Sequence, residues 1–389
     1  MLSDETKSLI HLSLIRGVGN QTIRCLLRAF ASAQKALTAA SEELAQVDGL
    51  TPAIRQRIVG GREDVSIDRE LQLIQTHGCQ VVTIHDESYP SLLKQIADSP
   101  PLLYIKGKLP PENTLNIAVV GSRSPTDYGK TICHQLSYQL AAKGITVVSG
   151  FARGLDTCAH RGALDAKGRT IGVLGNGLSL VYPEENRELA DDIVESGALI
   201  SEFPMTMPPI ARNFPRRNRV ISGLTWGTLV VEASDRSGAL ITARFAAEQG
   251  REVFAVPGQV FSKLSRGTHQ LINQGAHLIN TVDDLLDALP AHCLELPRLS
   301  STAQPPKKPQ VQSVVNHTPT QATQPTPAPA LQLSADEQAV LAAIDSPSSH
   351  IDQIARIAKL PINKVSGTLV MLELKEIIQQ LPGKRYVKK

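Results

Sequence analysis

Short runs of β-branched and other apolar residues alternate with longer segments of helical periodicity through the middle of the chain. Runs of this length, bounded by glycine-rich turns, predict buried strands, and the segments between them are long enough for crossover helices. This order predicts an α/β fold with a doubly wound, mostly parallel sheet. We expect strands at Asn116–Val120, Ile145–Ser149, Thr170–Leu174, Ala198–Ser201, Thr228–Val231 and Glu252–Val256, and helices at Tyr128–Lys143, Glu184–Ser196 and Ala239–Gln249.

The sheet domain is expected to span residues 79–290, with the run Cys79–Ile84 as an edge strand. Residues 1–72 instead show only helical patterns. Within them, Leu12–Leu27 predicts two helices joined by a Gly-Val-Gly turn, as in helix-hairpin-helix or SAM-like domains. Val47–Ile58 shows a weaker form of the same pattern of two helices joined by a turn. Such turns can aim backbone N–H groups at a nucleic-acid phosphate. The alternative is a helical packing domain, because no basic face is evident.

The amino-acid composition changes twice in the C-terminal part of the chain. Residues 291–333 are rich in Pro, Thr and Gln and poor in large apolar groups, which predicts a disordered linker. Residues 334–389 then predict three helices, among them Ile351–Ala358 and Pro361–Leu374, followed by a hairpin with Pro-Gly at its tip. This order is typical of a winged helix. Its second long helix carries no arginine, which does not favour base recognition.

Composition limits the classes of protein that remain. With 42% hydrophobic and 20% charged residues, the chain can bury a full core, and a net charge of +3 permits nucleic-acid binding without requiring it. The five cysteines form no C-x-x-C pair, which favours a reducing, cytoplasmic setting. The acidic N-terminus is unlike a signal peptide, and no apolar run approaches the ~18 residues of a membrane span.

The segment "IAVVGSRSPTDYGKT" poses the main chemical question, since it runs from a strand into Gly129-Lys130-Thr131. A nucleotide-hydrolysing P-loop needs G-x-x-x-x-G-K-[ST], but Ser124 stands where the first glycine belongs, and Pro125 lacks an N–H for phosphate. The strand that could supply a metal-binding aspartate ends in Glu232 instead. Nucleotide hydrolysis is therefore not favoured.

Other catalytic and cofactor patterns are also incomplete. Gly175 and Gly177 give only part of a dinucleotide-binding turn, and no nucleophile elbow is present. Asp156 and His160 share a helix face with Cys158 nearby, but they are too few for a metal site, and a helix cap with a packed histidine explains them. We therefore predict no enzyme activity, no catalytic residue, no cofactor and no metal.

The strongest binding pattern is a series of glycine turns at the expected carboxyl ends of strands, "VVGSR", "VSGFARG" and "VLGNG". Open α/β sheets bind ligands at this edge. Exposed N–H groups there form an anion site, to which a guanidinium adds a bidentate phosphate contact. The residues expected in these loops are Gly121, Ser122, Arg123, Ser149 and Gly150.

The densest cationic segment, "ARNFPRRNRVISGLTWG", places arginines around an aromatic residue. Such a segment can stack an unpaired base on the ring while arginines neutralise the backbone, as in single-strand binding. The alternative is a solvated basic turn with Phe214 in the core. The residues expected to bind DNA here are Phe214, Arg217, Asn218 and Arg219, with Arg212 in a supporting role.

At these positions the sequence resembles the DNA processing protein A family, DprA, also called Smf. The resemblance runs from about Tyr89 to Leu289 and includes both segments above, and the two terminal modules are similar to those of many members. It is carried by "YPSLLKQIADSPPLLYIKG", "VVGSRSPTDYG", "SGFARGLDTCAHRGAL", "YPEEN", "SEFP", "NFPRRNRVISGL", "VVEASDRSGALITARFAAEQGREVFAVPG" and "SRGTHQLINQGAHLI".

The resemblance implies an extended Rossmann-like fold that binds single-stranded DNA without catalysis. It further implies a protein that protects incoming DNA during natural transformation, acts with single-strand binding protein, and loads the RecA recombinase. A homodimer formed through the Rossmann-like domain is also implied. By position, the glycine loop of the family falls on Gly121, Ser122 and Arg123, and its base-stacking and backbone segment falls on Phe214 and residues 217–219.

Two other functions stay open on the sequence alone. One is an enzyme acting on a nucleoside phosphate, similar to Rossmann-like phosphoribohydrolases, with Glu232 as its only candidate catalytic group; the P-G-G-x-G-T-x-x-E pattern of that class is absent. The other is a winged-helix transcription factor, for which the candidate recognition helix lacks arginine.

Overall fold

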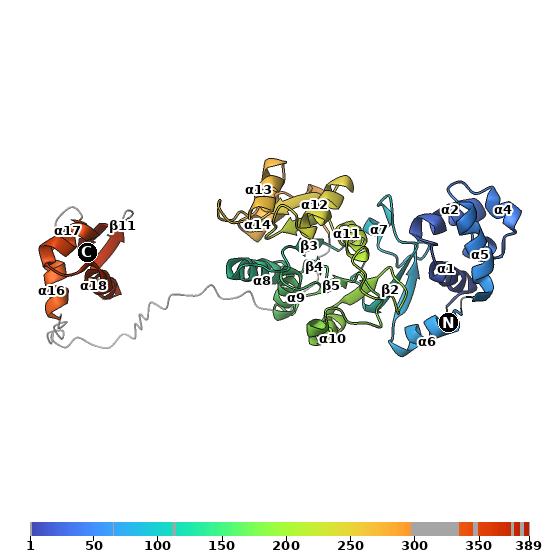
Figure 1. Ribbon diagram of the computed structural model, residues 1–389, viewed down its shortest axis with the longest axis horizontal. Coiled ribbons are helices and arrows are strands. Elements are labelled where there is room, and N and C mark those ends of the chain that lie inside the picture. The colour runs from blue at the N-terminus through green and yellow to red at the C-terminus, as the bar shows by residue number, and fades with distance from the viewer. Residues whose placement is uncertain are drawn as a thin grey trace. The chain divides into compact units, whose positions relative to one another are not determined.

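The computed structural model describes residues 2–64, 66–111, 114–296, 334–344, 349–374, 377–381 and 385–388. The chain divides into two compact units, residues 1–310 and residues 311–389, each of which is described by itself (Figure 1). None of the described helices is both long enough and apolar enough to span a membrane.

The first unit is built on a nine-stranded sheet with the order β1-β2-β6-β5-β4-β3-β7-β8-β9. Strands β3 to β9 pair in parallel, while β1 and β2 add an antiparallel edge. The strands are β1 (Gln80–Thr83), β2 (Leu102–Gly107), β3 (Asn116–Val120), β4 (Thr146–Ser149), β5 (Thr170–Val173), β6 (Ala198–Ser201), β7 (Gly227–Val230), β8 (Glu252–Ala255) and β9 (His277–Leu278).

Helices cover both faces of this sheet, as the alternation of side chains along a strand requires. In β3, Ile117 and Val119 point into a core shared with α8, α9 and α14, whereas Ala118 and Val120 point into a core shared with α7, α11 and α12. The covering helices are α7 (Ser91–Lys94), α8 (Asp127–Ala142), α9 (Leu155–Asp165), α10 (Arg187–Ser196) after the 3-10 turn η1 (Glu184–Asn186), α11 (Asn213–Gly223), α12 (Gly238–Glu248), α13 (Arg266–Asn273) and α14 (Val282–Asp287).

The predicted doubly wound α/β fold is confirmed, with every expected strand present to within a residue at either end. The run Cys79–Ile84 is the edge strand β1. Two strands were not predicted, β2 and β9. The first follows directly on two prolines and is buried throughout its first four residues, so no polar alternation marks it, and the second has only two residues.

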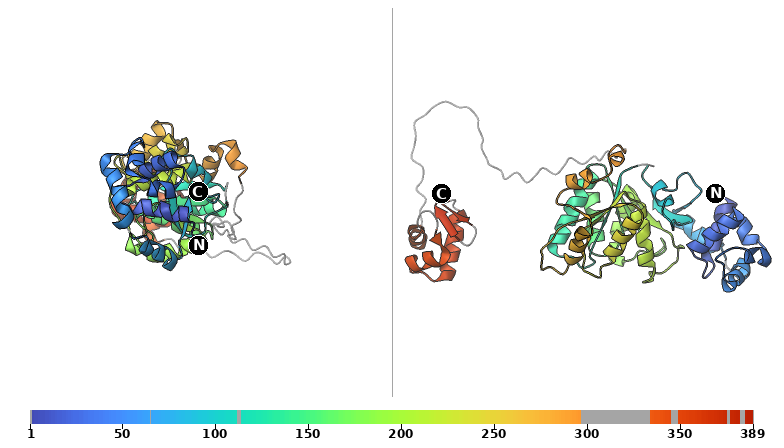
Figure 2. Two further views of the ribbon diagram at one scale, coloured as in Figure 1. Left: turned by 90° about the vertical axis from the view of Figure 1, so that its right-hand side faces the viewer. Right: turned by 90° about the horizontal axis from the view of Figure 1, so that it is seen from above.

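A helical domain packs against the antiparallel edge of the sheet (Figure 2). Its hairpin turns lie between α1 and α2 and between α4 and α5, as the two glycine patterns predicted. Its helices are α1 (Asp4–Leu14), α2 (Asn20–Phe30), α3 (Ala33–Thr38), α4 (Ser41–Ala45), α5 (Pro52–Asp64) and α6 (Asp68–Thr76).

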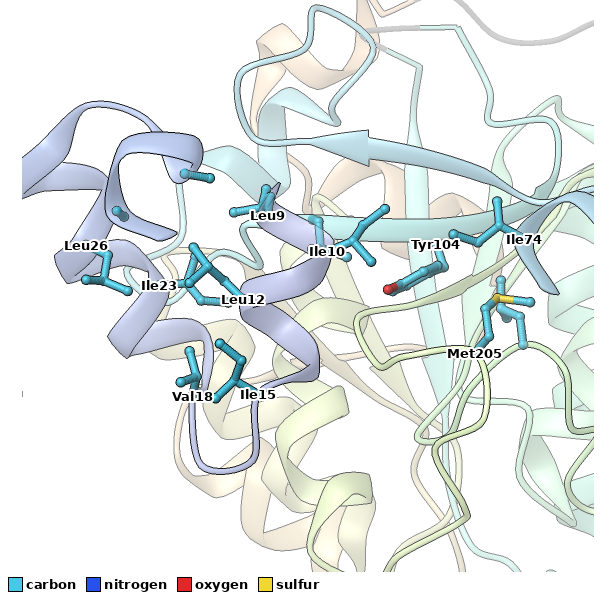
Figure 3. Close-up of a cluster of buried hydrophobic side chains, with 14 of the residues drawn as sticks. Leu9, Ile10, Leu12, Ile15, Val18, Ile23, Leu26, Ile74, Tyr104 and Met205 are labelled. Carbon is cyan, nitrogen blue, oxygen red and sulfur yellow. The ribbon is translucent and has the colours of Figure 1, made fainter. Parts of the chain in front are cut away.

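This helical domain shares one apolar core with the sheet (Figure 3). Ile10 of α1 and Ile74 of α6 are buried in the same cluster as Tyr104 of β2 and Met205. A polar contact adds to the apolar ones, because the buried Glu70 carboxylate accepts a hydrogen bond from the Met205 N–H at 2.8 Å. The helical domain therefore fixes Met205, in the connection between β6 and α11 that leads to Phe214.

The linker predicted from residue 291 begins with an ordered turn. Helix α15 (Ala291–Leu294) buries Cys293 in the core beneath α8 and α14, so the first residues of that range still belong to the sheet domain. Residues 297–333, and with them nearly all of the predicted linker, lie outside the described residues. The domain boundaries otherwise stay a prediction.

The second unit has the predicted order of three helices and a hairpin. Its elements are α16 (Ala335–Ala342), β10 (Ser349–His350), α17 (Ile351–Ala358), α18 (Ile362–Leu374), β11 (Ile378–Leu381) and β12 (Arg385–Lys388). The three strands pair antiparallel in the order β10-β12-β11. On the candidate recognition helix α18, Lys364 forms an ion pair with Asp336 of α16 at 2.8 Å, so this cation is engaged within the unit.

Candidate nucleic-acid interface

The glycine turns lie together at the carboxyl edge of the parallel strands. The strand order reverses direction between β3 and β7, the point where open α/β sheets bind ligands. A groove with a volume of about 720 Å³ opens there, between the loop that follows β3, the first turn of α11 and the segment before α12. Six of the predicted site residues line it: Gly121, Ser122, Arg123, Phe214, Arg217 and Asn218.

The loop after β3 is not a P-loop. Helix α8 already begins at Asp127, with the Thr126 hydroxyl accepting a hydrogen bond from the Gly129 N–H at 3.0 Å. Gly129-Lys130-Thr131 is thus part of the helix rather than a cradle before it. Lys130 is exposed and forms an ion pair with Asp127 at 2.8 Å. The loop offers exposed Arg123 instead of a phosphate-binding lysine.

Glu232, the candidate catalytic group of the enzyme alternative, holds this loop in place. Its carboxylate accepts hydrogen bonds from both the backbone N–H and the hydroxyl of Thr126. The side chain is buried, and a Cβ at Gly129 would collide with it. Glu232 therefore fixes the N-terminus of α8 after β3.

An aromatic platform stands at the mouth of the groove. Phe214 of α11 is half-buried, and the Arg123 guanidinium lies over its ring, 5.4 Å from the centroid. Tyr182, which is exposed, lies 5.9 Å from Phe214 between ring centroids. A Cβ at Gly175 would come within 3.0 Å of the Phe214 ring, so the ring rests on the end of β5 because no side chain occupies that position.

Arg217 occupies a different environment from Arg123. Its side chain is only 3% exposed, and its guanidinium donates to the carbonyl oxygens of Gly150 and Val173. A Cβ at Gly150 would lie 2.5 Å from an Asp156 carboxylate oxygen and 2.7 Å from the Arg217 guanidinium. Arg217 and Asp156 thus both lie against the backbone of the β4 loop at Gly150, and Arg217 ties this loop to β5.

The pKa directions in this cluster follow from burial. Burial lowers the pKa of Arg217 to about 10, which the Asp156 charge partly offsets, so Arg217 is a cation at neutral pH. Burial likewise raises the pKa of Asp156, against the attraction of Arg217. A buried cation that donates to two backbone carbonyl groups, with the Asp156 carboxyl nearby, orders the loop.

The remaining residues of the cationic segment divide by exposure. Arg219 is buried and pairs with Glu202 at 2.6 Å and with Asp98 at 3.0 Å. Asn218 is 8% exposed and donates to the Gly238 carbonyl at 3.2 Å. Arg212 and Arg216 are exposed at the start of α11. The sequence alone did not separate these two groups of arginines.

The predicted residues of the β4 loop face inward. Ser149 is fully buried and donates to the Val119 carbonyl at 2.6 Å. The Gly150 carbonyl accepts from Arg217, and Gly150 lines a smaller pocket of about 230 Å³ beside Phe214. The structure thus brings Gly121, Ser122, Arg123 and Phe214 together around open space, whereas Ser149 and Arg219 line neither pocket. DNA contact by any of these residues stays a prediction.

Two residues that line the groove, Tyr182 and Asp156, were not among the predicted site residues. Tyr182 lines both pockets next to Phe214, although it follows β5 rather than the cationic segment. The only sequence feature that pointed to Tyr182 was the segment "YPEEN", which it begins and which is part of the family resemblance. Asp156 was interpreted as a helix cap, but Gly154 is the N-cap of α9, and Asp156 lies in its first turn and accepts a hydrogen bond from the Ala152 N–H at 3.2 Å. Its proximity to Arg217 could not be predicted from the local sequence.

The buried His160 of α9 predicts that the stability of the protein depends on pH. The Thr170 hydroxyl donates to Val147, so it accepts from His160 Nδ1, and His160 Nε2 has no hydrogen-bond partner within the part of the chain that the structure describes. Burial lowers the pKa of His160 from 6.5 to about 3. Below pH 6.5 the unfolded state therefore binds a proton that the folded state does not, and stability falls as pH falls.

We expect His160 to remove about 2 kcal/mol of unfolding free energy between pH 7 and pH 5. Urea unfolding of the wild type and His160→Asn at both pH values measures this, because asparagine keeps an N–H donor for Thr170 but does not titrate. The variant should lose less stability on acidification. Equal losses in the two proteins would contradict the assignment.

The fold and the groove together define an extended Rossmann-like protein with a helical N-terminal domain and a C-terminal winged helix. The sequence model described as DNA recombination-mediator protein A matches residues 80–290, and that of the DprA winged helix domain matches residues 324–384. The chain therefore belongs to the DprA family, as the sequence resemblance predicted.

Individual relatives agree with this assignment. The chain is 34% identical to Protein Smf of Synechocystis sp. over 399 residues, which cover 99% of each chain. The X-ray structure of DprA from Streptococcus pneumoniae superimposes with a TM-score of 0.67 at 33% identity, covering 74% of this chain and 99% of that one. A DprA structure from Helicobacter pylori, whose description concerns its mode of binding single-stranded DNA, is 29% identical and covers 54% of this chain and 94% of that one, with a TM-score of 0.48.

Proposed function

We propose that this protein binds single-stranded DNA without sequence preference and without catalysis, at the groove bordered by Arg123 and Phe214. The observation that carries the proposal is the Arg123 guanidinium lying over the half-exposed Phe214 ring at the carboxyl edge of the sheet. An aromatic face can stack any base, and the arginine beside it can neutralise the adjoining phosphate. Exposed Arg212 and Arg216 extend the positive charge along α11.

Family membership supports the cellular role. Because the chain belongs to the recombination-mediator family, we propose that it protects incoming single strands during natural transformation, acts with single-strand binding protein and loads the RecA recombinase. A homodimer through the Rossmann-like domain would join two such grooves, so that one strand could engage both.

The enzyme alternative is not favoured. A phosphoribohydrolase-like reaction would need Glu232 free to act on a substrate, but its carboxylate accepts two hydrogen bonds from Thr126. The transcription-factor alternative is likewise weak, because Lys364 on α18 is paired with Asp336.

Loading of the recombinase can be tested directly. A single strand coated with single-strand binding protein is incubated with RecA and ATP, and the DNA-dependent ATP hydrolysis of RecA is followed with and without this protein. We expect the wild type to shorten the lag before hydrolysis and Phe214→Ala to leave it long. An unchanged lag with the wild type would contradict the loading role, while leaving single-strand binding to be judged by titration.

A further inference from the structure

The loop between β8 and α13, residues 257–265, presents an unusual pair of apolar side chains. Phe261 is 96% exposed and the adjacent Val260 is 73% exposed, the two highest values among the large apolar residues that the structure describes. Single exposed apolar residues are ordinary, but a contiguous pair with its surface almost wholly in water marks an interaction site. Nothing in the groove described above uses these residues.

This loop is held by hydrogen bonds on both sides of Phe261. The Ser262 N–H donates to the Gln259 carbonyl at 3.0 Å, and the Ser265 N–H donates to the Ser262 carbonyl at 3.2 Å. Beyond them, the Leu264 carbonyl accepts from the Ala233 N–H, next to the end of β7, at 2.7 Å. The ring is thus presented from an anchored turn, which lowers the entropy cost of binding against it.

The loop also continues the groove. Leu264 lines the groove that Phe214 borders, and Phe261 precedes it by three residues, a reach of roughly 10 Å of chain. At the other end of the loop, the Pro257 carbonyl accepts from the Tyr128 hydroxyl at 3.4 Å, and Tyr128 is itself 52% exposed on the first turn of α8. The loop that carries Phe261 is therefore tied to the first turn of α8 at one end and reaches the groove at Leu264.

The charge around Phe261 fits a nucleic-acid backbone. Lys263 and Arg266 are exposed on the loop and at the start of α13, and Arg266 approaches Asp235 only at 3.7 Å. Basic groups beside an exposed aromatic ring are the arrangement that binds single strands, in which bases stack on the ring and phosphates meet the cations.

We propose that Phe261 is a second base-stacking position, so that a single strand bound over Phe214 continues along the groove to the 257–265 loop. This rests on the proposed function, and it adds a residue and a direction for the strand. The occupant is a base of the same strand, because the loop is continuous with the groove and its neighbours are cationic.

The test uses oligo-dT from about 4 to about 16 nucleotides, the range of known single-strand site sizes, titrated into the full-length protein. Loss of one stacked base should lower affinity by roughly 5- to 150-fold. We expect Phe261→Ala to show this loss for the longest strands and no loss for the shortest, whereas Phe214→Ala weakens binding at every length. Phe261→Leu should behave like Phe261→Ala, because leucine is apolar but has no aromatic face.

Fluorescence gives an independent readout. The chain has one tryptophan, so Phe261→Trp introduces a reporter against the background of Trp226 alone. Quenching of the added signal by long oligo-dT, and little quenching by the shortest, is expected. Unchanged affinity of Phe261→Ala at all lengths would overturn the proposal, as would full affinity in Phe261→Leu together with dimer dissociation in Phe261→Ala, which would assign the loop to a second copy. Full binding by Phe214→Ala would instead overturn the proposed groove.

Discussion

Replacing Phe214 with alanine should weaken single-strand binding by roughly 5- to 150-fold, the value of one base stacked on an aromatic ring. The ring offers a stacking face directly next to Arg123, whose guanidinium lies 5.4 Å from its centroid. Phe214→Trp should retain binding and Phe214→Leu should lose it. Fluorescence anisotropy with a labelled oligonucleotide measures all three.

A matched control for this prediction exists on α12. Phe245 is also half-buried with an arginine, Arg244, 5.7 Å from its ring centroid, but it does not line the groove. Phe245→Ala should leave single-strand affinity unchanged. If both variants bind as the wild type does, or both lose affinity together, Phe214 is not a specific stacking position.

Replacing Arg217 with alanine should lower the free energy of unfolding by about 2–6 kcal/mol, at about 1–3 kcal/mol for each of two buried carbonyl groups left without a donor. The substitution leaves the Gly150 and Val173 carbonyls without their donor and removes a nearby positive charge that attracts the buried Asp156 carboxyl. Arg217→Lys should recover only part of the loss, because a single ammonium group cannot also replace the hydrogen bond that Arg217 Nε donates to Asn218 Oδ1 at 3.1 Å. Urea unfolding gives the values.

Arg212, an exposed arginine at the start of α11, serves as the control, because its replacement removes the same charge without removing a buried contact. Arg212→Ala should change stability by less than about 0.5 kcal/mol, as surface substitutions do, while weakening DNA binding modestly. A result in which Arg217→Ala is as stable as the wild type but binds DNA poorly would show that Arg217 meets the phosphate directly, as the sequence alone predicted.

The sheet could be predicted because its strands are buried on both faces and bounded by glycine turns. The pattern at Asn116–Val120 predicted both ends of β3 correctly. The antiparallel strand β2 was harder to predict, since it follows two prolines and lies between β1 and β6, away from the repeating strand-helix order.

The candidate site was only partly predictable, because the position of a loop follows from the strand order but the burial of a side chain depends on residues far away in the chain. Glycine turns and the strand ends placed Arg123 correctly at the groove, because the carboxyl ends of parallel strands meet at one edge. The burial of Arg217 and Arg219 depends on Asp156 and Glu202, which lie 61 and 17 residues away in the chain. Charge density in a sequence cannot distinguish a cation that faces water from one that holds a loop together, since both appear as arginine beside phenylalanine.

The central claim, that this groove binds single-stranded DNA through Arg123, is tested most directly by salt-dependent titration of single-stranded and duplex oligonucleotides of equal length. With Arg123, Arg212 and Arg216 as the exposed contacts, log affinity should fall against log salt with a slope of about −2 for the single strand, at about −0.7 for each contact. Arg123→Ala should flatten that slope by about 0.7, and the duplex should bind more weakly. Equal affinity for both DNA forms, or an Arg123→Ala slope equal to that of the wild type, would contradict the account.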